Sequence, residues 1–239
     1  MRIAVASPSF KARMAGVFYL LTFAIGGLAT ATAGKLIHEG DAAATATSIM
    51  SHQGAYRVGF AAYLIVVFCY LVVTALFYEL FKPVSRTVSR IAAMFSLAGC
   101  AIQALICLFL LAPFVLLAGD PYLGAFTPEQ LRSLNLVFLN LYGQGWYICF
   151  ATFGVYCLLI GYLIFKSTFM PRVLGVFMAI AGLGWLMFLD PPFAERTFPF
   201  ILAAGLFGEG SLTLWLLVKG VNVAKWDEKN SLARAVRMG

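Results

Sequence analysis

The side chain best suited to chemistry in this chain is Glu209, a carboxyl inside the last long apolar run. It stands in Gly208-Glu209-Gly210-Ser211, and Gly205 lies one helical turn before it. An ionised carboxylate at membrane depth costs roughly 3 kcal/mol on insertion scales, and acids placed there usually serve a function. We therefore expect Glu209 to face the interior of a helix bundle, protonated or paired, as the only acid at membrane depth.

Two interpretations of Glu209 fit the sequence. In the functional one, the carboxyl binds a cation or a proton, or anchors a polar head group, and the small residues around it let a ligand or helix come close. In the structural one, a neutral Glu209 donates a hydrogen bond to another helix and fixes the packing. The residue types leave both open.

Polar side chains in other apolar runs are candidate partners of Glu209 in one ligand-binding pocket. The candidates are Arg57, Gln103, Tyr142, Gln144 and Tyr156. Asn135 and Asn140 lie just outside the membrane in the same interpretation. For each Gln or Asn the alternative is an ordinary hydrogen bond between helices, worth about 0.6 kcal/mol. The alternative for Arg57 is to extend outward toward Asp41 or Glu39.

No motif for metal binding, a cofactor or covalent catalysis is present. The two histidines, His38 and His52, share a loop with Glu39 and Asp41, but their spacing matches no metal motif, so we expect no metal site. There is no G-x-S-x-G, H-E-x-x-H, Walker or G-x-G-x-x-G pattern in a suitable context. We expect no cofactor, and a non-enzymatic role is favoured over an enzymatic one.

Composition places the chain in lipid. Of its 239 residues 62% are hydrophobic and only 11% charged, whereas soluble domains carry about 25% charged residues. The net charge of +7 comes from basic residues just outside apolar runs, which indicates contact with the membrane surface and not with nucleic acid. All five cysteines fall within apolar runs, which argues against a disulfide framework.

Six apolar runs are long enough to cross a bilayer, which needs about 20 residues. The predicted fold is an all-α membrane protein in one domain, 1–239, with a tail at 219–239. The predicted spans are 14–34, 56–81, 90–118, 142–165, 172–189 and 197–218.

Lysine and arginine are sorted by side of the membrane. With the N-terminus in the cytoplasm, thirteen fall inside and four outside, which by the positive-inside rule puts both termini in the cytoplasm. The inner set includes Arg2 and Arg237, and the outer set is Lys35, Arg57, Arg132 and Arg196. A cleavable signal peptide ending near Ala29-Thr30-Ala31-Thr32-Ala33 is the alternative for the first run.

A helix start precedes the fourth span at Thr127-Pro128-Glu129-Gln130, with Thr as N-cap and Pro at the first position. A helix from there to Lys166 would be about 58 Å long, more than one crossing needs. We predict a short outer interfacial helix over 128–141, with Leu131, Leu134, Phe138 and Leu141 toward the membrane and a break at Gly143 and Gly145. One long helix is the alternative.

The three outward-going helices open alike, with an arginine, a small residue one turn later and a phenylalanine. The openings begin at Arg13, Arg90 and Arg172, spaced by 77 and 82 residues. This pattern indicates three parallel helical hairpins, or convergence on one way of anchoring a helix. The stripe Gly175, Ala179 and Gly182 is typical of a helix-packing face, and the tail with Trp226 of an anchor at the inner surface.

Several segments together resemble a known family. They are Gly40-Asp41-Ala42-Ala43-Ala44-Thr45, Arg57-Val58-Gly59-Phe60, Gly161 to Ser167, Pro171 to Gly175, and Gly208-Glu209 leading to Gly220. From about Arg13 to Gly220 the chain resembles the bacterial integral membrane family catalogued as domain of unknown function 4386. The resemblance implies six spans in a bacterial inner membrane and no established activity. Family members often carry histidine on the fourth span where this chain has Tyr142 and Tyr156, which argues against a metal or haem role here.

The leading hypothesis is a Glu209-centred intramembrane pocket that binds a small ligand, a cation or a proton for transport or sensing. One alternative is a membrane-embedded enzyme that acts on a lipid or quinone, with a second polar group within hydrogen-bond reach of Glu209. The other is a structural or accessory subunit whose outer helix at 128–141 docks a partner.

Overall fold

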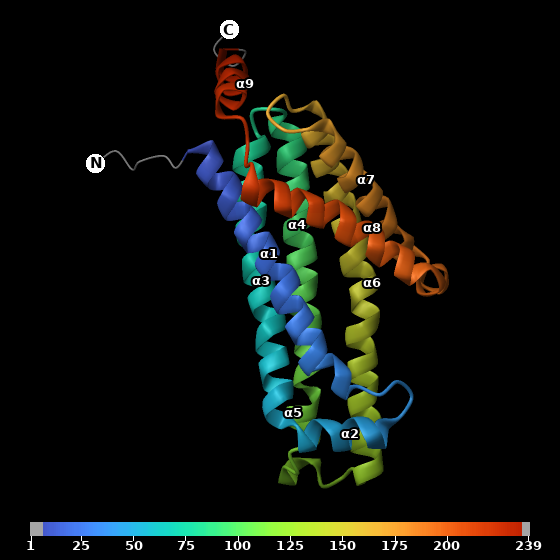
Figure 1. The fold of residues 1–239 in the computed structure, drawn as a ribbon. Coiled ribbons are helices and arrows are strands. Elements are labelled where there is room, and N and C mark those ends of the chain that lie inside the picture. The colour runs from blue at the N-terminus through green and yellow to red at the C-terminus, as the bar shows by residue number, and fades with distance from the viewer. Residues whose placement is uncertain (1–6, 236–239) are drawn as a thin grey trace, which may run out of the picture. The chain divides into compact units, whose positions relative to one another are not determined.

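The computed structural model describes residues 7–235, and these are helical almost throughout, with no strand among them (Figure 1). Arg2 and Arg237, two of the basic residues counted as inner, lie outside this range. The α-helices are α1 (Pro8–Thr32), α2 (Ala42–Ser51), α3 (Gln53–Phe81), α4 (Arg86–Ile106), α5 (Ala112–Leu116), α6 (Pro128–Lys166), α7 (Arg172–Leu186), α8 (Pro191–Val218) and α9 (Val223–Ala235). Short 3-10 turns cover Gly34–Leu36, Cys107–Leu111, Pro121–Leu123 and Met187–Leu189.

Six helical segments are long and apolar enough to cross a membrane, as the sequence predicts. They are Pro8–Leu36, Gln53–Phe81, Arg86–Leu116, Pro128–Lys166, Arg172–Leu189 and Pro191–Val218. In a helix every internal backbone N–H and C=O pairs within the segment, which is the condition for crossing hydrocarbon. The fold is that of an all-α, multi-pass membrane protein.

The last span begins earlier than predicted. The sequence indicated 197, whereas α8 begins at Pro191, with Asp190 as its N-cap. An Asp190 carboxyl oxygen accepts from Phe193 N at 3.4 Å, and proline suits a first helical turn because that turn has no use for its missing N–H. The Asp-Pro-Pro sequence was therefore a helix start that hydropathy alone did not reveal.

The predicted interfacial helix over 128–141 is wrong. Residues 128–166 form one continuous helix, α6, and Gly143 and Gly145 do not break it. The predicted start is confirmed, since Gln130 Oε1 accepts from Thr127 N at 2.8 Å and Thr127 Oγ1 accepts from Gln130 N at 3.3 Å. Gly145 instead serves packing, because a Cβ at that position would clash with Ile106 on α4.

The apolar face of the early part of α6 also points elsewhere than predicted. Three of its four residues pack against the buried Ala112, Leu116 and Leu123 of α5 and the following turn, not toward lipid. The three are Leu131, Leu134 and Phe138, whereas Leu141 is exposed. Hydropathy could not distinguish these faces because a neighbouring apolar helix and lipid present the same kind of surface.

A short helix does lie in the loop between the first two spans, where none was predicted. In α2, an Asp41 carboxyl oxygen accepts from Ala44 N at 2.8 Å and caps the helix. The sequence signal was an N-cap aspartate followed by three alanines, a good cap and good helix formers.

The chain divides into two compact units. The first unit comprises Met1–Leu20, Cys69–Gly99 and Ile148–Gly239, and the second comprises Leu21–Phe68 and Cys100–Tyr147. All five cysteines are buried, and none forms a disulfide within residues 7–235. Glu209 belongs to the first unit, so its packing positions the candidate site.

Glycines bring α6 and α7 into backbone contact in the first unit. A Cβ added at Gly182 would lie 2.8 Å from Gly154 O, and one added at Gly161 would lie 2.7 Å from Gly175 O. Gly154 and Gly161 are two turns apart on α6, and Gly175 and Gly182 are two turns apart on α7. The two close contacts therefore belong to one seam between these helices. The seam confirms the packing face predicted from Gly175, Ala179 and Gly182.

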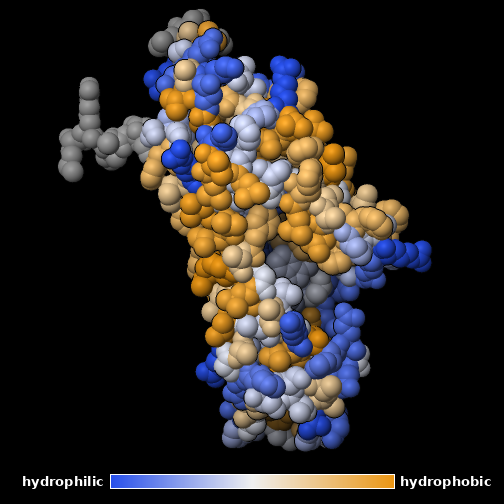
Figure 2. Space-filling model, viewed as in Figure 1, coloured by the Kyte–Doolittle hydropathy of each residue, from blue (hydrophilic) through white to orange (hydrophobic). Residues whose placement is uncertain are grey.

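The outer faces of the first unit are apolar. On α7 the exposed side chains include Val173, Val176, Ile180 and Leu183. Figure 2 shows hydrophobic residues over α7 and α8 and hydrophilic ones over α9. Figure 1 shows α7 alongside α8, and both helices expose large apolar side chains.

The glycine seam predicts unequal effects of two alanine substitutions. Gly182→Ala places a methyl group against the backbone of Gly154, so we expect the free energy of unfolding in detergent to fall by about 1–3 kcal/mol. Gly184→Ala is the control, because its added Cβ would meet nothing closer than Ile201 Cγ2 at 3.7 Å. That variant should keep or slightly raise stability, since alanine is the better helix former. Equal losses in the two variants would contradict the seam.

Candidate functional site

Glu209 lies on the buried face of α8, closer to the Val218 end than to the Pro191 end. Only 6% of its surface is exposed. The buried residues of this part of α8 recur at helical spacing: Ile201, Gly205, Gly208, Glu209, Leu212, Thr213 and Leu216. This periodicity turns the carboxyl into the first unit and away from lipid.

Each carboxyl oxygen of Glu209 accepts a hydrogen bond from a different helix. Tyr19 Oη of α1 donates to Oε2 at 2.5 Å, and Trp185 Nε1 of α7 donates to Oε1 at 2.6 Å. Hydrogen bonds to a carboxylate are short and strong. The two bonds join α1, α7 and α8 through one side chain and compensate the carboxyl for the water it lost on burial.

Aromatic packing fixes the Tyr19 ring. Tyr19 is fully buried and meets the rings of Tyr70 and Phe77 edge to face, at centroid distances of 5.7 and 5.9 Å. Its hydroxyl also lies 3.4 Å from Tyr70 Oη, with either oxygen able to donate. The hydroxyl of Tyr19 therefore stands between a carboxyl and a second tyrosine.

Stacking and a glycine fix Trp185. Its indole stacks on Phe150 of α6, with 4.9 Å between centroids and 17° between planes. Gly205 lies directly beneath the indole, and a Cβ there would clash with Trp185 Cζ2. A glycine one turn before Glu209 thus provides the space through which Trp185 reaches the carboxyl.

Gly208 brings the helix itself close. A Cβ at Gly208 would lie 2.5 Å from Phe177 O and 2.8 Å from Ala181 Cβ, so α8 crosses the backbone of α7 here. The prediction that glycines around Glu209 admit a neighbouring helix is confirmed for Gly208, whereas Gly205 admits a side chain of that helix. A Cβ at Gly210, in contrast, would meet nothing within 4 Å.

Further polar side chains line the interior of the first unit. Tyr156 and Cys157 of α6 are almost completely buried, and Tyr156 meets Tyr70 edge to face at 6.1 Å. Thr74 Oγ1 donates to Tyr70 O at 2.8 Å and lies 2.6 Å from Ser96 Oγ. The interior of the first unit therefore holds hydroxyl groups from several helices and is not a purely apolar core.

The predicted site residues do not all belong to this unit. Tyr156 shares it with Glu209, whereas Arg57, Gln103, Tyr142 and Gln144 belong to the second unit. The pocket predicted from all six residues therefore remains a prediction, and the geometry within the first unit concerns Glu209 and its tyrosines.

In the second unit, Tyr142 packs against Tyr63 at 5.6 Å and Trp146 at 6.1 Å. Gln103 is buried, and its Nε2 has no hydrogen-bond partner among residues 7–235. Gln144 is exposed. Arg57 is exposed as well, with its guanidinium 5.3 Å from the centre of the Phe114 ring, a cation–π contact in place of the predicted extension toward an acid.

Two partners of Glu209 were missed from the sequence. Tyr19 is a single phenol in a stripe of small buried residues that includes Ala12 and Ala15, and a buried tyrosine hydroxyl needs a partner. Trp185 was not distinguished from an ordinary interfacial tryptophan, since it lies near the outer end of a predicted span. The usable signal for Trp185 was Gly205, because a glycine next to a buried acid leaves room for a large ring.

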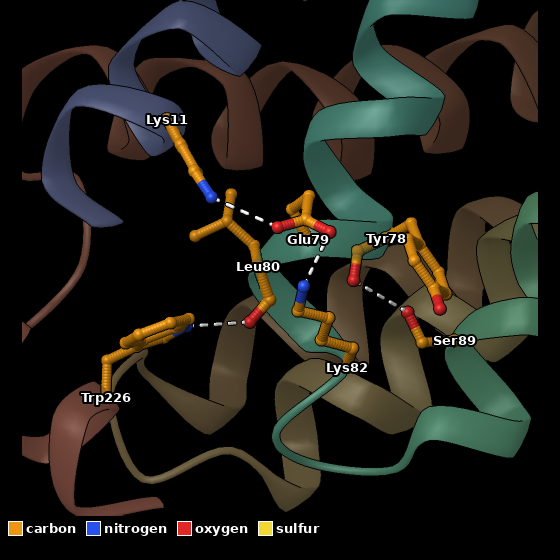
Figure 3. A network of polar contacts seen from close by, with 7 residues as sticks. All are labelled: Lys11, Tyr78, Glu79, Leu80, Lys82, Ser89 and Trp226. Carbon is orange, nitrogen blue, oxygen red and sulfur yellow. Dashed lines mark hydrogen bonds and ion pairs between the residues drawn. The ribbon is translucent and has the colours of Figure 1, made fainter. Parts of the chain in front are cut away.

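Glu209 is also not the only acid in a spanning helix. Glu79 lies near the end of α3, where its carboxylate pairs with Lys11 Nζ of α1 at 3.1 Å and Lys82 Nζ at 2.6 Å. Figure 3 shows both lysines turned toward Glu79. The Glu79 side chain is 36% exposed, so solvent reaches this pair and its contribution to stability is small.

The same end of the first unit holds the tail. Trp226 Nε1 of α9 donates to Leu80 O at 2.9 Å (Figure 3), and Asn222 N donates to Phe169 O at 3.1 Å. Trp226 is buried, while most other residues of α9 are exposed. One tryptophan and one backbone bond therefore attach the start of α9 to the helix bundle.

No cluster of three or more His, Cys, Asp or Glu side chains suited to a metal is found within residues 7–235. The histidines make hydrogen bonds in the first loop, with His38 Nε2 2.8 Å from Ser48 Oγ and His52 Nδ1 3.0 Å from Ser48 O.

The six membrane-length apolar helices are those of a membrane protein, and the Glu209 carboxyl with donors from two of them forms a polar site inside its first unit. The chain belongs to the family described as Domain of unknown function (DUF4386), whose model matches residues 14–220. It is similar to an "Uncharacterized protein" of Archaeoglobus fulgidus, with 26% identity over 162 residues that cover 66% of this chain and 80% of the relative. No solved structure matches the chain.

The fit between Gly205 and Trp185 predicts that one methyl group disrupts the site. Gly205→Ala should displace the indole from Glu209 and lower the free energy of unfolding by about 1–3 kcal/mol, because Glu209 Oε1 stays buried without its donor. Trp185→Phe should cost a similar amount, and the double variant little more than either single one.

Gly210→Ala is the matched control on the same helix, since its Cβ has open space, and it should be neutral. Additive losses from Gly205→Ala and Trp185→Phe would show that the glycine and the indole act independently, against this account.

Proposed function

We propose that Glu209 is an intramembrane binding site for a proton or a small cation, and that this binding drives transport or sensing. The observation that carries the proposal is the Glu209 carboxyl buried in a spanning helix with a neutral donor on each oxygen. Packing alone could use a cheaper side chain, whereas a carboxyl at this depth adds a group whose charge can change.

The surroundings support a change of charge at Glu209. Its hydrogen-bond donors, Tyr19 and Trp185, are both neutral, and no ion pair with Glu209 is found within residues 7–235. A fixed positive partner would hold the carboxylate permanently charged. With neutral donors, one added proton or cation removes the net charge of the site.

The two rival functions find less support. The enzyme hypothesis predicts a second polar group within hydrogen-bond reach of Glu209, and Tyr19 and Trp185 meet that condition. Both are already bonded to the carboxyl, however, so a lipid or quinone would first have to displace one of them. An accessory subunit that docks a partner through 128–141 would need an outer interfacial helix, and that segment instead continues into α6 and packs on α5 and the following turn.

The proposed location is the inner membrane of a bacterium with both termini in the cytoplasm. The support is the distribution of basic residues, thirteen on the inner side against four on the outer. The Glu79 cluster with Lys11 and Lys82 then lies at the cytoplasmic end of α3.

The direct test is Glu209→Gln in proteoliposomes, with proton and alkali-cation flux followed by internal indicator dyes under an imposed gradient. We expect the flux or the saturable cation binding of the natural protein to fall at least tenfold, because glutamine keeps the shape but cannot bind a proton. Unchanged flux and binding in a folded Glu209→Gln protein would contradict the proposal.

Glu79→Gln is the matched control, since Glu79 is another acid in a spanning helix and is paired with Lys11 and Lys82. We expect it to retain the flux, and gel filtration of all variants separates loss of function from loss of fold.

A further inference from the structure

We infer that the species bound at Glu209 is a proton, and that its arrival reverses the Tyr19 hydroxyl, which turns from Glu209 toward Tyr70. This inference rests on the proposed function and narrows it. Proton binding would thereby reverse the direction of the hydrogen bond between α1 and α8 and turn the Tyr19 donor toward Tyr70 of α3, all within the first unit.

The contacts of Glu209 distinguish which of its two carboxyl oxygens takes the proton. Trp185 faces Oε1 at 2.6 Å with its indole N–H, and an indole nitrogen donates but never accepts. A hydrogen on Oε1 would therefore point at another hydrogen. The partner of Oε2 is a hydroxyl, which can accept as well as donate. We therefore place the proton on Oε2, where a bond to hydrogen forms and the carboxylate becomes a neutral carboxylic acid.

Protonation at Oε2 displaces the Tyr19 hydrogen. Tyr19 Oη lies 2.5 Å from Oε2, a separation that holds one hydrogen and not two. In the ionised state that hydrogen belongs to Tyr19. In the protonated state it belongs to Glu209, so Tyr19 must accept this bond and turn its own hydrogen away.

Tyr70 provides the new acceptor for the Tyr19 hydrogen. Tyr70 Oη lies 3.4 Å from Tyr19 Oη, and the geometry allows either oxygen to donate. A hydroxyl rotates about its C–O bond with little cost, so the Tyr19 ring can remain in place between Tyr70 and Phe77. The hydrogen bonds that link Glu209 Oε2, Tyr19 Oη and Tyr70 Oη can therefore run in either direction without any helix moving.

Among residues 7–235, the other groups around Glu209 supply no competing charge. The titratable side chains facing this cluster are Tyr19 on α1, Tyr70 on α3, and Tyr156 and Cys157 on α6. From α7 comes Trp185, which does not titrate, and α8 adds the hydroxyl of Thr213, which donates to Glu209 O at 2.8 Å. Glu209 is the acid among them.

A metal cation fits these contacts less well. An ion at Oε1 would meet the Trp185 N–H, and one at Oε2 would have to displace the Tyr19 hydrogen and find several more oxygens. A proton needs only Glu209 Oε2 and a rotation of the Tyr19 hydroxyl.

The test is an infrared titration of the carboxylic acid band in liposomes, with the Glu209→Gln spectrum subtracted to isolate Glu209. Tyr19→Phe removes a donor that the ionised form needs more, so its titration midpoint should rise by about one pH unit, a tenfold gain in proton affinity. Tyr70→Phe removes the acceptor that only the protonated form requires, so its midpoint should fall by a similar amount.

Tyr162→Phe is the control, because Tyr162 lies on α6 but is 48% exposed, and its midpoint should match the natural protein. Opposite shifts for Tyr19→Phe and Tyr70→Phe support the inference. A titrating Glu209 with an unmoved midpoint in Tyr70→Phe overturns the hydroxyl reversal and leaves the proposed function standing. If Glu209 never titrates, the inference that it binds a proton is overturned. The cation-flux experiment would still test the proposed function.

If the tyrosine variants do not fold, a second measurement on the natural protein tests the inference. Isotope-labelled tyrosine shifts the infrared C–O band of the phenols, which differs between a donating and an accepting hydroxyl. We expect a tyrosine band to change with the same midpoint as the Glu209 band. A tyrosine spectrum constant through that transition would overturn the inference.

Discussion

The first unit depends on one constraint: a carboxyl inside a membrane-spanning helix must find donors within the protein, because lipid offers none. Glu209 meets this constraint with Tyr19 and Trp185, so a single side chain holds α8 to both α1 and α7. The packing nearby follows from the same need. Phe150 supports the indole and Phe77 supports the phenol ring, which holds both rings in place beside the carboxyl.

Glycine makes this arrangement sterically feasible. Lipid gives little drive for helices to associate, so their packing relies on close backbone approach. The seam between Gly154 and Gly182 fixes α7 against α6, and Gly208 fixes α8 against α7. Gly205 has a different task, since it faces a side chain and not a backbone. The glycines thus set the distances at which Trp185 and Glu209 can meet, and the polar site is a product of the small residues around it.

The number of spans and the place of Glu209 were predictable from sequence because hydropathy, charge and helix length decide them. The continuity of α6 through Gly145 was not predictable. Ile106 of another helix occupies the space beside that glycine, and no local sequence pattern reveals this neighbour. Tyr19 and Trp185 were missed for a related reason. Their role depends on which helices lie beside α8, and apolar helices look alike from outside. Glu79 was overlooked because its partner Lys11 lies far away in sequence, although Lys82 was within one turn.

Glu209 faces the interior of the first unit and accepts hydrogen bonds from two neutral donors. An experimental structure in lipid nanodiscs, at a resolution that places side chains, tests this arrangement most directly. We expect Tyr19 Oη and Trp185 Nε1 each within hydrogen-bond distance of a different Glu209 oxygen, with the Trp185 indole lying over Gly205. A Glu209 turned toward lipid, or one paired with a lysine or arginine, would contradict the account.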